Sequence, residues 1–534
     1  MASYRNPVVP GHAPDPSVVL VGDRFLLVNS SFGMLPGLPI RSSTDLVHWE
    51  TIGHAVTRPS QYRRDGLPGP VELFAPTIRH HDGVFYVVCT NAHPGQGNFL
   101  VTATDPAGEW SDAIWLDAEA FDPSLFRDDD GAWFYTRRSL EFGRPDGNLG
   151  PIVQARIDLD TGALGELRPI TPGSGGFVTN DIEGPHLFRR GDWYYLTGAE
   201  GSSWKGHLQS IGRSRSPWGP FEPAPHNPIV THRDRVGHPI QSLGHVDFVE
   251  DGDGRWWALA LGTRHAPLSQ HHNIGRETFL LPVEWVDDWP VVGRAGTTEL
   301  VVDGVELPVA STPAPAPAPA PGPAVRPRLG PLDWVTVGEP PAGLVRDRDP
   351  AEGIILSAGG DLTETTRPIG ALLTRQTSDR QRFSVRVEAV SSSAGTGVAV
   401  FVNRTHHYSA VVRGDGGERV VVFRRHVDDL VAEQATPIPG RGALVLRIEA
   451  HPDRYDVVAL VDGGEKEIAC GTGSARLLSA ESVEWFESAH FALVHAGEPG
   501  TAPARFAEVA LEDPPADPPV IVPPFIRELR PAAS

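Results

Sequence analysis

The sequence is poor in cysteine and in long apolar runs. Among 534 residues only Cys89 and Cys470 could form a disulfide, so a disulfide framework is excluded and we expect both thiols to be buried. No eighteen consecutive apolar residues occur, which argues against a membrane-spanning helix. The first residues lack the apolar segment of a secretory signal. We therefore expect a soluble, cytoplasmic protein.

Basic residues are outnumbered by acidic ones. The chain has 67 Asp and Glu against 46 Lys and Arg, a net charge of −21, which repels nucleic acids and anionic membrane surfaces. We expect neither as a partner, whereas a neutral ligand is compatible with this charge. At this length a single hydrophobic core is excluded, so the chain is expected to form two or three domains.

Several kinds of catalytic motif are also missing. There is no Gly-x-Ser-x-Gly elbow for a serine nucleophile, Cys89 lies inside an apolar run, and no glycine-rich phosphate loop occurs. The three histidine doublets do not have the spacing of a metal motif. Nucleophilic serine or cysteine chemistry, phosphoryl transfer and a catalytic metal are therefore not expected.

A short phrase of a Gly or Asp followed by aromatics in a β-prone run occurs five times in the first three hundred residues. The leading aromatics are 60, 48, 60 and 63 residues apart: Phe25, Phe85, Trp133, Trp193 and Trp256. This period is typical of one propeller blade with its loops, and no long helical period interrupts it. The fold is predicted to be all-β, with residues 1–308 forming a five-bladed β-propeller.

A proline- and alanine-rich stretch separates this repeat from the rest of the chain. Residues 309–328 cannot pair in a sheet and favour polyproline II, so they are predicted to be a linker. Residues 329–534 contain alternating apolar and polar segments divided by Gly and Asp turns, which indicates a β-sandwich. Whether the proline-rich tail after Glu512 packs back or stays loose is left open.

Four of the five repeats carry an ionisable residue ten or eleven positions before the aromatic: Asp15, Asp122, Glu183 and His245. The second repeat has Ala75 there. If each residue opens the innermost strand of its blade, all of them converge near the propeller axis. An Asp at a strand start also caps turns by accepting backbone N–H groups, but capping does not explain the shared blade position. We therefore expect three carboxylates and an imidazole in one pocket.

Gathered carboxylates beside aromatics are what glycosidic bond hydrolysis requires, one protonated as an acid and one ionised as a base. A third carboxylate such as Asp122 could keep the acid protonated, because like charges raise a neighbour's pKa. His245 could bind a cation, orient a carboxylate or donate a hydrogen bond to a sugar. These alternatives stay open at this point.

Several phrases of the sequence match a known family. They are Pro14-Asp15-Pro16-Ser17, Ser43-Thr44-Asp45-Leu46-Val47-His48-Trp49, Phe121-Asp122-Pro123-Ser124, Glu183-Gly184-Pro185-His186, Gly244-His245 and Gly275-Arg276-Glu277-Thr278. On these phrases, over nearly its whole length, the chain resembles glycoside hydrolase family 43, in its two-domain β-xylosidase and α-L-arabinofuranosidase branch. The resemblance implies a five-bladed propeller that hydrolyses with inversion, followed by a C-terminal, concanavalin-like sandwich (a jelly roll).

The resemblance also implies roles for the matching residues. Asp15 would be the general base that activates water, Glu183 the general acid, and Asp122 the residue that tunes and orients the acid. Arg276 would bind sugar hydroxyls and offset the negative charge near Asp122 or Asp15. Without the resemblance, the sequence around Arg276 is equally compatible with a surface ion pair. His245 would lie on the pocket floor.

Three phenylalanines are further candidates for sugar contacts. Phe32 matches an aromatic that lines the sugar pocket in relatives, and Phe74 stands where relatives commonly have tryptophan. Phe491 lies in a stretch that, in this branch, places an aromatic over the pocket mouth. The alternative for each ring is ordinary core packing.

The predicted activity is an exo-acting, inverting glycosidase that releases D-xylose, L-arabinose or both from the ends of short oligosaccharides. Its main activity would be that of a β-xylosidase, with α-L-arabinofuranosidase as the first alternative. A sugar-binding protein without catalysis is an alternative of another class, and the intact set Asp15, Asp122 and Glu183 argues against it. No cofactor is expected to be required, with calcium beside His245 as the one cation considered. A homo-oligomer is left open.

Overall fold

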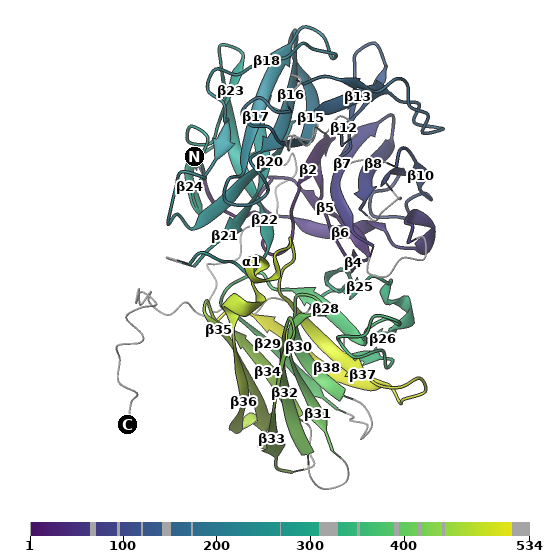
Figure 1. Cartoon of the computed structure of the whole chain (residues 1–534), viewed down its shortest axis with the longest axis vertical. Coiled ribbons are helices and arrows are strands. Elements are labelled where there is room, and N and C mark those ends of the chain that lie inside the picture. The colour runs from purple at the N-terminus through teal and green to yellow at the C-terminus, as the bar shows by residue number, and fades with distance from the viewer. Residues whose placement is uncertain are drawn as a thin grey trace.

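The computed structural model describes residues 2–64, 71–92, 97–118, 121–140, 151–171, 175–266, 269–308, 329–349, 353–388, 395–414, 419–440 and 444–514. They form two β-rich bodies stacked along the long axis of the molecule, the first in purple to teal and the second in green to yellow (Figure 1). Within these ranges, none of the helices has the length and apolar character needed to cross a membrane.

The first body is the predicted propeller of five antiparallel blades. The innermost strands β2, β7, β11, β15 and β20 contact one another around the axis. The blades are β2 (Ser17–Val21), β3 (Arg24–Val28), β5 (Gly37–Ser43) and β6 (Glu50–Val56); β7 (Leu73–His81), β8 (Val84–Asn91), β9 (Gly97–Ala103) and β10 (Ile114–Trp115); β11 (Ser124–Arg127), β12 (Trp133–Arg138), β13 (Ile152–Arg156) and β14 (Arg168–Pro169); β15 (Ile182–Arg190), β16 (Trp193–Glu200), β17 (Leu208–Ser214) and β18 (Glu222–Pro223), with β19 (Val230–Thr231) also on β17; and β20 (Ile240–Glu250), β21 (Trp256–Arg264), β22 (Arg276–Val286) and β23 (Trp289–Val292).

The repeated aromatics explain the regularity of the blades. Each lies on the second strand of its blade and packs in, or at the edge of, an apolar cluster of the propeller. Burying such rings supplies much of the free energy that holds neighbouring sheets together. Because one phrase is used five times, one packing solution is repeated around the axis.

The first residues of the chain pair with a strand that follows the last blade. β1 (Ala2–Arg5) runs antiparallel to β24 (Val301–Val305), and the side chain of Asn6 donates to Leu280 O at 3.0 Å and accepts from Leu280 N at 2.9 Å. These contacts tie the start of the propeller to its fifth blade without a covalent link.

The second body is a sandwich of two antiparallel sheets. The seven-stranded sheet runs β26 (Val345–Asp349), β27 (Gly353–Leu356), β38 (Ala504–Glu512), β29 (Gln381–Val387), β34 (Leu444–Ala450), β35 (Arg454–Val461) and β36 (Lys466–Ser474). The six-stranded sheet runs β28 (Ala371–Arg375), β37 (His490–Ala496), β30 (Gly395–Phe401), β31 (His406–Arg413), β32 (Arg419–Val427) and β33 (Leu430–Ile438). The one α-helix of the described residues, α1 (Ala480–Val483), follows β36.

Short 3-10 turns complete the described structure: Pro59–Gln61, Pro331–Asp333, Pro341–Gly343, Asp462–Gly464 and Ala475–Leu478. The predicted linker 309–328 and the tail from residue 515 onward lie outside the described residues.

The sandwich packs against one end of the propeller. β4 (Met34–Leu35) in the first blade pairs with β25 (Thr336–Val337), and Arg64 forms an ion pair with Glu339 at 2.7 Å. On the other side, α1 and the loop after it reach the loop between β21 and β22 (Figure 1). The segment 480–489 thus lies between the two bodies.

Candidate active site

Each blade places a residue with left-handed backbone geometry near the axial end of its innermost strand. Their φ angles are 50° at Asp15, 37° at Ala75, 60° at Asp122, 54° at Gly184 and 48° at His245. Proline follows the first four. The innermost strands contact one another around the axis, and the structure therefore brings Asp15, Asp122 and His245 to equivalent positions in their blades.

Glu183 does not belong to this ring, and the prediction that it shares the blade position of Asp15 is wrong by one residue. In the strand pairing, Glu183 lies opposite Ala199 as Phe74 lies opposite Thr90, so Gly184 is the ring residue of its blade. A side chain at position 184 is excluded sterically, because its Cβ would lie 2.8 Å from the imidazole of His245. The fourth blade therefore carries its carboxylate on the preceding residue.

Asp15 is buried and held from three sides. Ser30 Oγ donates to Asp15 Oδ2 at 2.5 Å, while Arg276 Nη1 and His245 Nδ1 lie 3.5 and 3.6 Å from Oδ1. Burial alone would raise the pKa of Asp15, but the charges of Arg276 and His245 and the Ser30 hydrogen bond outweigh it and lower the pKa. Asp15 is therefore ionised at neutral pH, as a general base must be.

Asp122 has the opposite character. It accepts a 2.8 Å hydrogen bond from the Gly184 N–H, and its own N–H donates to Thr90 Oγ1 at 3.1 Å. Burial, followed by the charges of Glu183 and Asp15, raises its pKa well above the ordinary value. The surroundings of Asp122 therefore favour its protonated form more than water does.

Glu183 is fixed by an arginine and a serine. Arg138 Nη1 contacts Glu183 Oε2 at 2.7 Å, and Ser203 Oγ donates to Oε1 at 3.0 Å. Arg138 also pairs with Asp181 at 2.7 Å and covers the ring of Phe121 at 4.8 Å. Arg138 and Ser203 thus hold the two oxygens of the Glu183 carboxyl in place.

Aromatic rings form one wall of the pocket. Phe32 and Phe74, both predicted from the sequence, lie with ring centroids 4.7 Å apart. The guanidinium of Arg276 lies 4.5 Å from the ring centre of Phe486 and 5.2 Å from that of Phe32. Trp204 packs on Phe486 at 5.4 Å. Flat apolar rings beside charged groups suit the C–H face and the hydroxyls of a sugar.

Phe491 is not part of this wall, and its prediction is wrong. The side chain is fully buried in the sandwich core and stacks on Phe383 with centroids 5.3 Å apart and an interplanar angle of 10°. Its backbone pairs with Thr374 and Val400 inside the six-stranded sheet. The sandwich aromatics that reach this wall are Phe486, which contacts Arg276, and Trp485, whose ring centroid lies 6.4 Å from that of Phe74; both precede β37.

Four polar residues that contact these acidic residues were not predicted: Ser30, Thr90, Arg138 and Ser203. The first three stand five positions after a repeated aromatic, namely Phe25, Phe85 and Trp133. The second strand of a blade runs antiparallel to the first, so its end lies beside the axial start of the first strand. This spacing is the signal that would have found the first three.

The residues around His245 do not fit a calcium ion held by the protein. Calcium takes six to eight oxygen ligands, whereas His245 has the single carboxylate of Asp15 nearby, shared with Arg276. Over the described ranges, His245 is in no group of three His, Cys, Asp or Glu side chains close enough to share an ion. We derive no catalytic step through a cation there.

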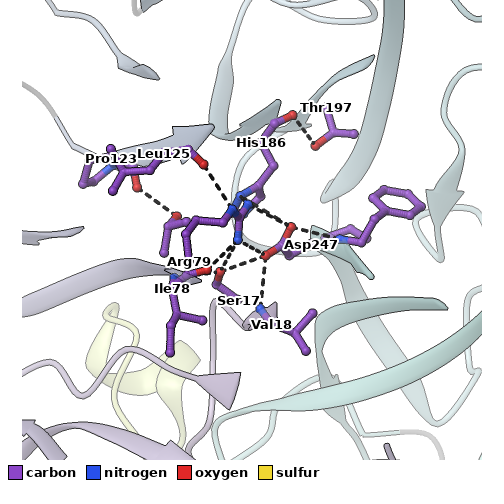
Figure 2. A network of polar contacts seen from close by, with 12 residues as sticks. Ser17, Val18, Ile78, Arg79, Pro123, Leu125, His186, Thr197 and Asp247 are labelled. Atoms are coloured by element: carbon purple, nitrogen blue, oxygen red, sulfur yellow. Dashed lines mark hydrogen bonds and ion pairs between the residues drawn. The ribbon is translucent and has the colours of Figure 1, made fainter. Parts of the chain in front are cut away.

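A buried polar network further along the axis joins all five blades (Figure 2). Asp247 Oδ2 accepts from Ser17 Oγ at 2.8 Å and from Arg79 Nη1 at 3.0 Å. Arg79 also donates to Leu125 O at 3.1 Å and lies 3.3 Å from His186 Nδ1. This network fixes the inner strands that carry the carboxylates.

Comparison with known proteins agrees with this geometry. The description "Glycosyl hydrolases family 43" matches residues 4–290, and "Beta xylosidase C-terminal Concanavalin A-like domain" matches residues 329–512. The predicted class of all-β propeller plus sandwich, and the predicted family, are confirmed.

Individual relatives match either most of the chain or about half of it. The chain is 35% identical over 516 residues to a non-reducing end α-L-arabinofuranosidase of Bacteroides ovatus, covering 94% of each chain. It is 42% identical over 304 residues to a xylosidase/arabinosidase of Butyrivibrio fibrisolvens, covering 55% of this chain and 57% of that one. The crystal structure of a xylan β-1,4-xylosidase from Bacillus halodurans superposes with a TM-score of 0.83 at 26% identity, over 95% of this chain and 100% of the other. The chain therefore belongs to glycoside hydrolase family 43 and is a glycosidase.

Proposed function

We propose that this enzyme releases D-xylose or L-arabinose from the non-reducing ends of short xylo- and arabino-oligosaccharides, with inversion. The observation that carries the proposal is the contrast between two buried carboxyls in one pocket. Asp15 has a lowered pKa and can accept a proton, whereas Asp122 has a raised pKa and can hold one beside Glu183.

In the proposed reaction, Asp15 takes a proton from a water molecule that attacks the anomeric carbon. Glu183 gives a proton to the glycosidic oxygen as its bond to that carbon breaks, so the sugar leaves as a free monosaccharide with inverted configuration. Arg276 stays on Asp15 and fixes the carboxylate in place. Asp122 accepts a hydrogen bond from the Gly184 amide next to Glu183 and orients the acid from there.

Exo action is supported by the position of the sandwich. Phe486 lies against Arg276 and Trp204, so the wall of the pocket is completed by the second body. A pocket closed in this way accepts the end of a chain more readily than its middle. Short neutral oligosaccharides also fit the acidic protein. Their hydrolysis inside the cell, as a late step of xylan degradation, is part of this proposal.

The second candidate is α-L-arabinofuranosidase as the main activity. It is favoured by the name of the relative that matches over 94% of both chains. The β-xylosidase alternative is supported by the name of the solved structure that superposes over 95% of this chain. D-xylopyranose and L-arabinofuranose offer similar hydroxyl arrays, so one pocket can take both.

The test is steady-state kinetics of the purified protein on 4-nitrophenyl β-D-xylopyranoside and 4-nitrophenyl α-L-arabinofuranoside, with the double variant Asp15→Asn, Glu183→Gln as the inactive control. Turnover that is lost in the double variant supports the proposal, and the ratio of the two kcat/KM values names the main substrate. Proton NMR of the first sugar anomer released tests inversion. Turnover of neither substrate would contradict the proposed substrates.

A further inference from the structure

Two histidines and a glutamate meet between the propeller and the sandwich, outside the carboxylate pocket. His265 and His272 lie in the loop between β21 and β22, and Glu481 lies on α1. One ligand atom from each lies within 4.8 Å of the other two. His272 Nδ1 is 3.0 Å from Glu481 Oε1, and the two imidazole centroids are 5.2 Å apart.

The cluster contains a buried nitrogen that the protein leaves without a partner. His265 is only 7% exposed, and its Nδ1 has no hydrogen-bond partner in the part of the chain that the structure describes. Its Nε2 lies 3.1 Å from Thr263 Oγ1, which fixes the ring orientation. Buried polar atoms are nearly always satisfied, so an orphan imidazole nitrogen beside a histidine and a carboxylate points to a ligand that supplies the missing bond.

The donor set selects the class of ligand. Two imidazoles and one carboxylate are the donors that zinc and its neighbours among the divalent transition metals bind, whereas calcium and magnesium prefer all-oxygen sites. Zinc bonds of about 2.0–2.1 Å place ligand atoms roughly 3.4 Å apart, so small rotations of the imidazoles would close the cluster around an ion.

We propose that His265, His272 and Glu481 form a binding site for one divalent transition-metal ion, zinc or a similar metal. The ion would connect the propeller loop that leads into Arg276 with the sandwich segment that leads into Phe486. The backbone already links the same segments, since Ala480 N donates to His272 O and Ala489 N to Asn273 O. The site therefore strengthens an existing contact and holds Phe486 on the pocket wall.

Zinc titration of the full-length, tag-free protein after treatment with EDTA tests the proposal. We expect one zinc ion per chain by isothermal titration calorimetry, a higher Tm with zinc, and no such change with calcium. Cobalt in place of zinc should give the visible absorption of a site with nitrogen and oxygen ligands. These readouts do not depend on turnover, so the site can fail while the proposed glycosidase function stands, and the reverse.

Three variants separate this site from adventitious binding. His265→Gln should weaken zinc affinity at least tenfold and remove the zinc-dependent rise in Tm. Glu481→Gln, at a partly exposed helix position, should also weaken zinc affinity and remove the zinc-dependent rise in Tm. It tests the site if His265→Gln does not fold. His48→Gln removes an exposed imidazole beside Asp45 and should leave binding unchanged. No zinc bound by the wild-type protein, or equal zinc affinity in the wild type and both site variants, would overturn the proposal.

Discussion

Ser30 connects Asp15, the proposed general base, to the neighbouring blade. Its hydroxyl donates a 2.5 Å hydrogen bond to Asp15 and accepts a 2.6 Å hydrogen bond from the N–H of Ala75. Because the Ser30 hydroxyl both donates and accepts a hydrogen bond, its direction is fixed. It therefore holds Oδ2 of Asp15, while Oδ1 faces Arg276 and His245. The base is thus positioned by residues from three different blades.

Ser30→Ala should therefore change the pH dependence of the enzyme. The hydrogen bond is one of the causes that lower the pKa of Asp15, so its loss raises that pKa and moves the acidic limb of kcat/KM to higher pH. We expect kcat at the pH optimum to fall about tenfold or less, because Arg276 remains. A pH–rate profile checks this, and an unshifted acidic limb would contradict the role of Ser30. Ser31→Ala, one residue further along, is the matched control.

Glu183→Gln should act according to the leaving group. A general acid contributes about 10²–10⁴ in rate when the leaving group is poor, and little when it is an activated phenol. We expect a large loss on xylobiose and a small one on 2,4-dinitrophenyl β-D-xylopyranoside. Equal losses on the two substrates would show that Glu183 is not the acid. Asp15→Asn is the comparison, since loss of the base should suppress both.

Asp122→Asn should gain stability while losing activity. The folded protein raises the pKa of Asp122, so its burial in the ionised form costs stability at pH values above the folded pKa and nothing below the unfolded pKa of about 3.9. We expect the variant to have the higher Tm at pH 8, with the difference disappearing toward pH 4, and kcat lowered by about 10² or more. Thermal unfolding from pH 4 to 8 checks the sign. A constant difference in Tm over this range would count against the assignment.

Substitution of Phe486 should change activity, whereas substitution of Phe491 should change stability. Phe486→Ala removes a ring of the pocket wall and should raise KM or lower kcat with little change in Tm. Phe491→Ala empties a fully buried core position and should cost about 3–5 kcal/mol of unfolding free energy, while the folded fraction keeps its kcat/KM. Denaturation and kinetics on both variants test the pair, and the reverse pattern would show that the wrong ring has been assigned to the pocket.

Asp247→Asn should lower the free energy of unfolding of the propeller. It leaves the partly buried guanidinium of Arg79 without its charged partner, which costs about 3–5 kcal/mol for a buried pair. Burial alone would raise the pKa of Asp247, but Arg79 and His186 outweigh it and lower the pKa, so the pair stabilises the fold above pH 4 and less below it. Urea unfolding at pH 7 and pH 3 should show the larger difference at pH 7. An equal difference at both pH values would contradict this assignment.

The fold was predictable because its signal is repeated. Five copies of one aromatic phrase give five blades even where single strands, such as the two-residue β10 and β14, carry almost no pattern. The sandwich followed from alternation in segments such as β29, whose residues are alternately buried and partly exposed. Repetition averages over local exceptions, which is why the architecture was clear from the sequence.

The site was predictable only in part, and the failures have physical causes. The position of Glu183 was misplaced because the packing of His245 against Gly184 is a contact between blades, which no local pattern records. Phe486 and Phe491 lie five residues apart in one phrase, and the turn between α1 and β37 decides which ring enters the core. Sequence spacing identifies a strand, but the backbone turns at its ends decide where each side chain points.

The contact of Phe486 with Arg276 joins two separate stretches of the chain at the site. All three carboxylates and their immediate partners come from residues 15–276, whereas the ring that completes the wall comes from a body that starts after residue 328. Changes in the second body can therefore alter this part of the wall while the carboxylates stay unchanged. An exchanged second body would give an inherited catalyst a new range of substrates.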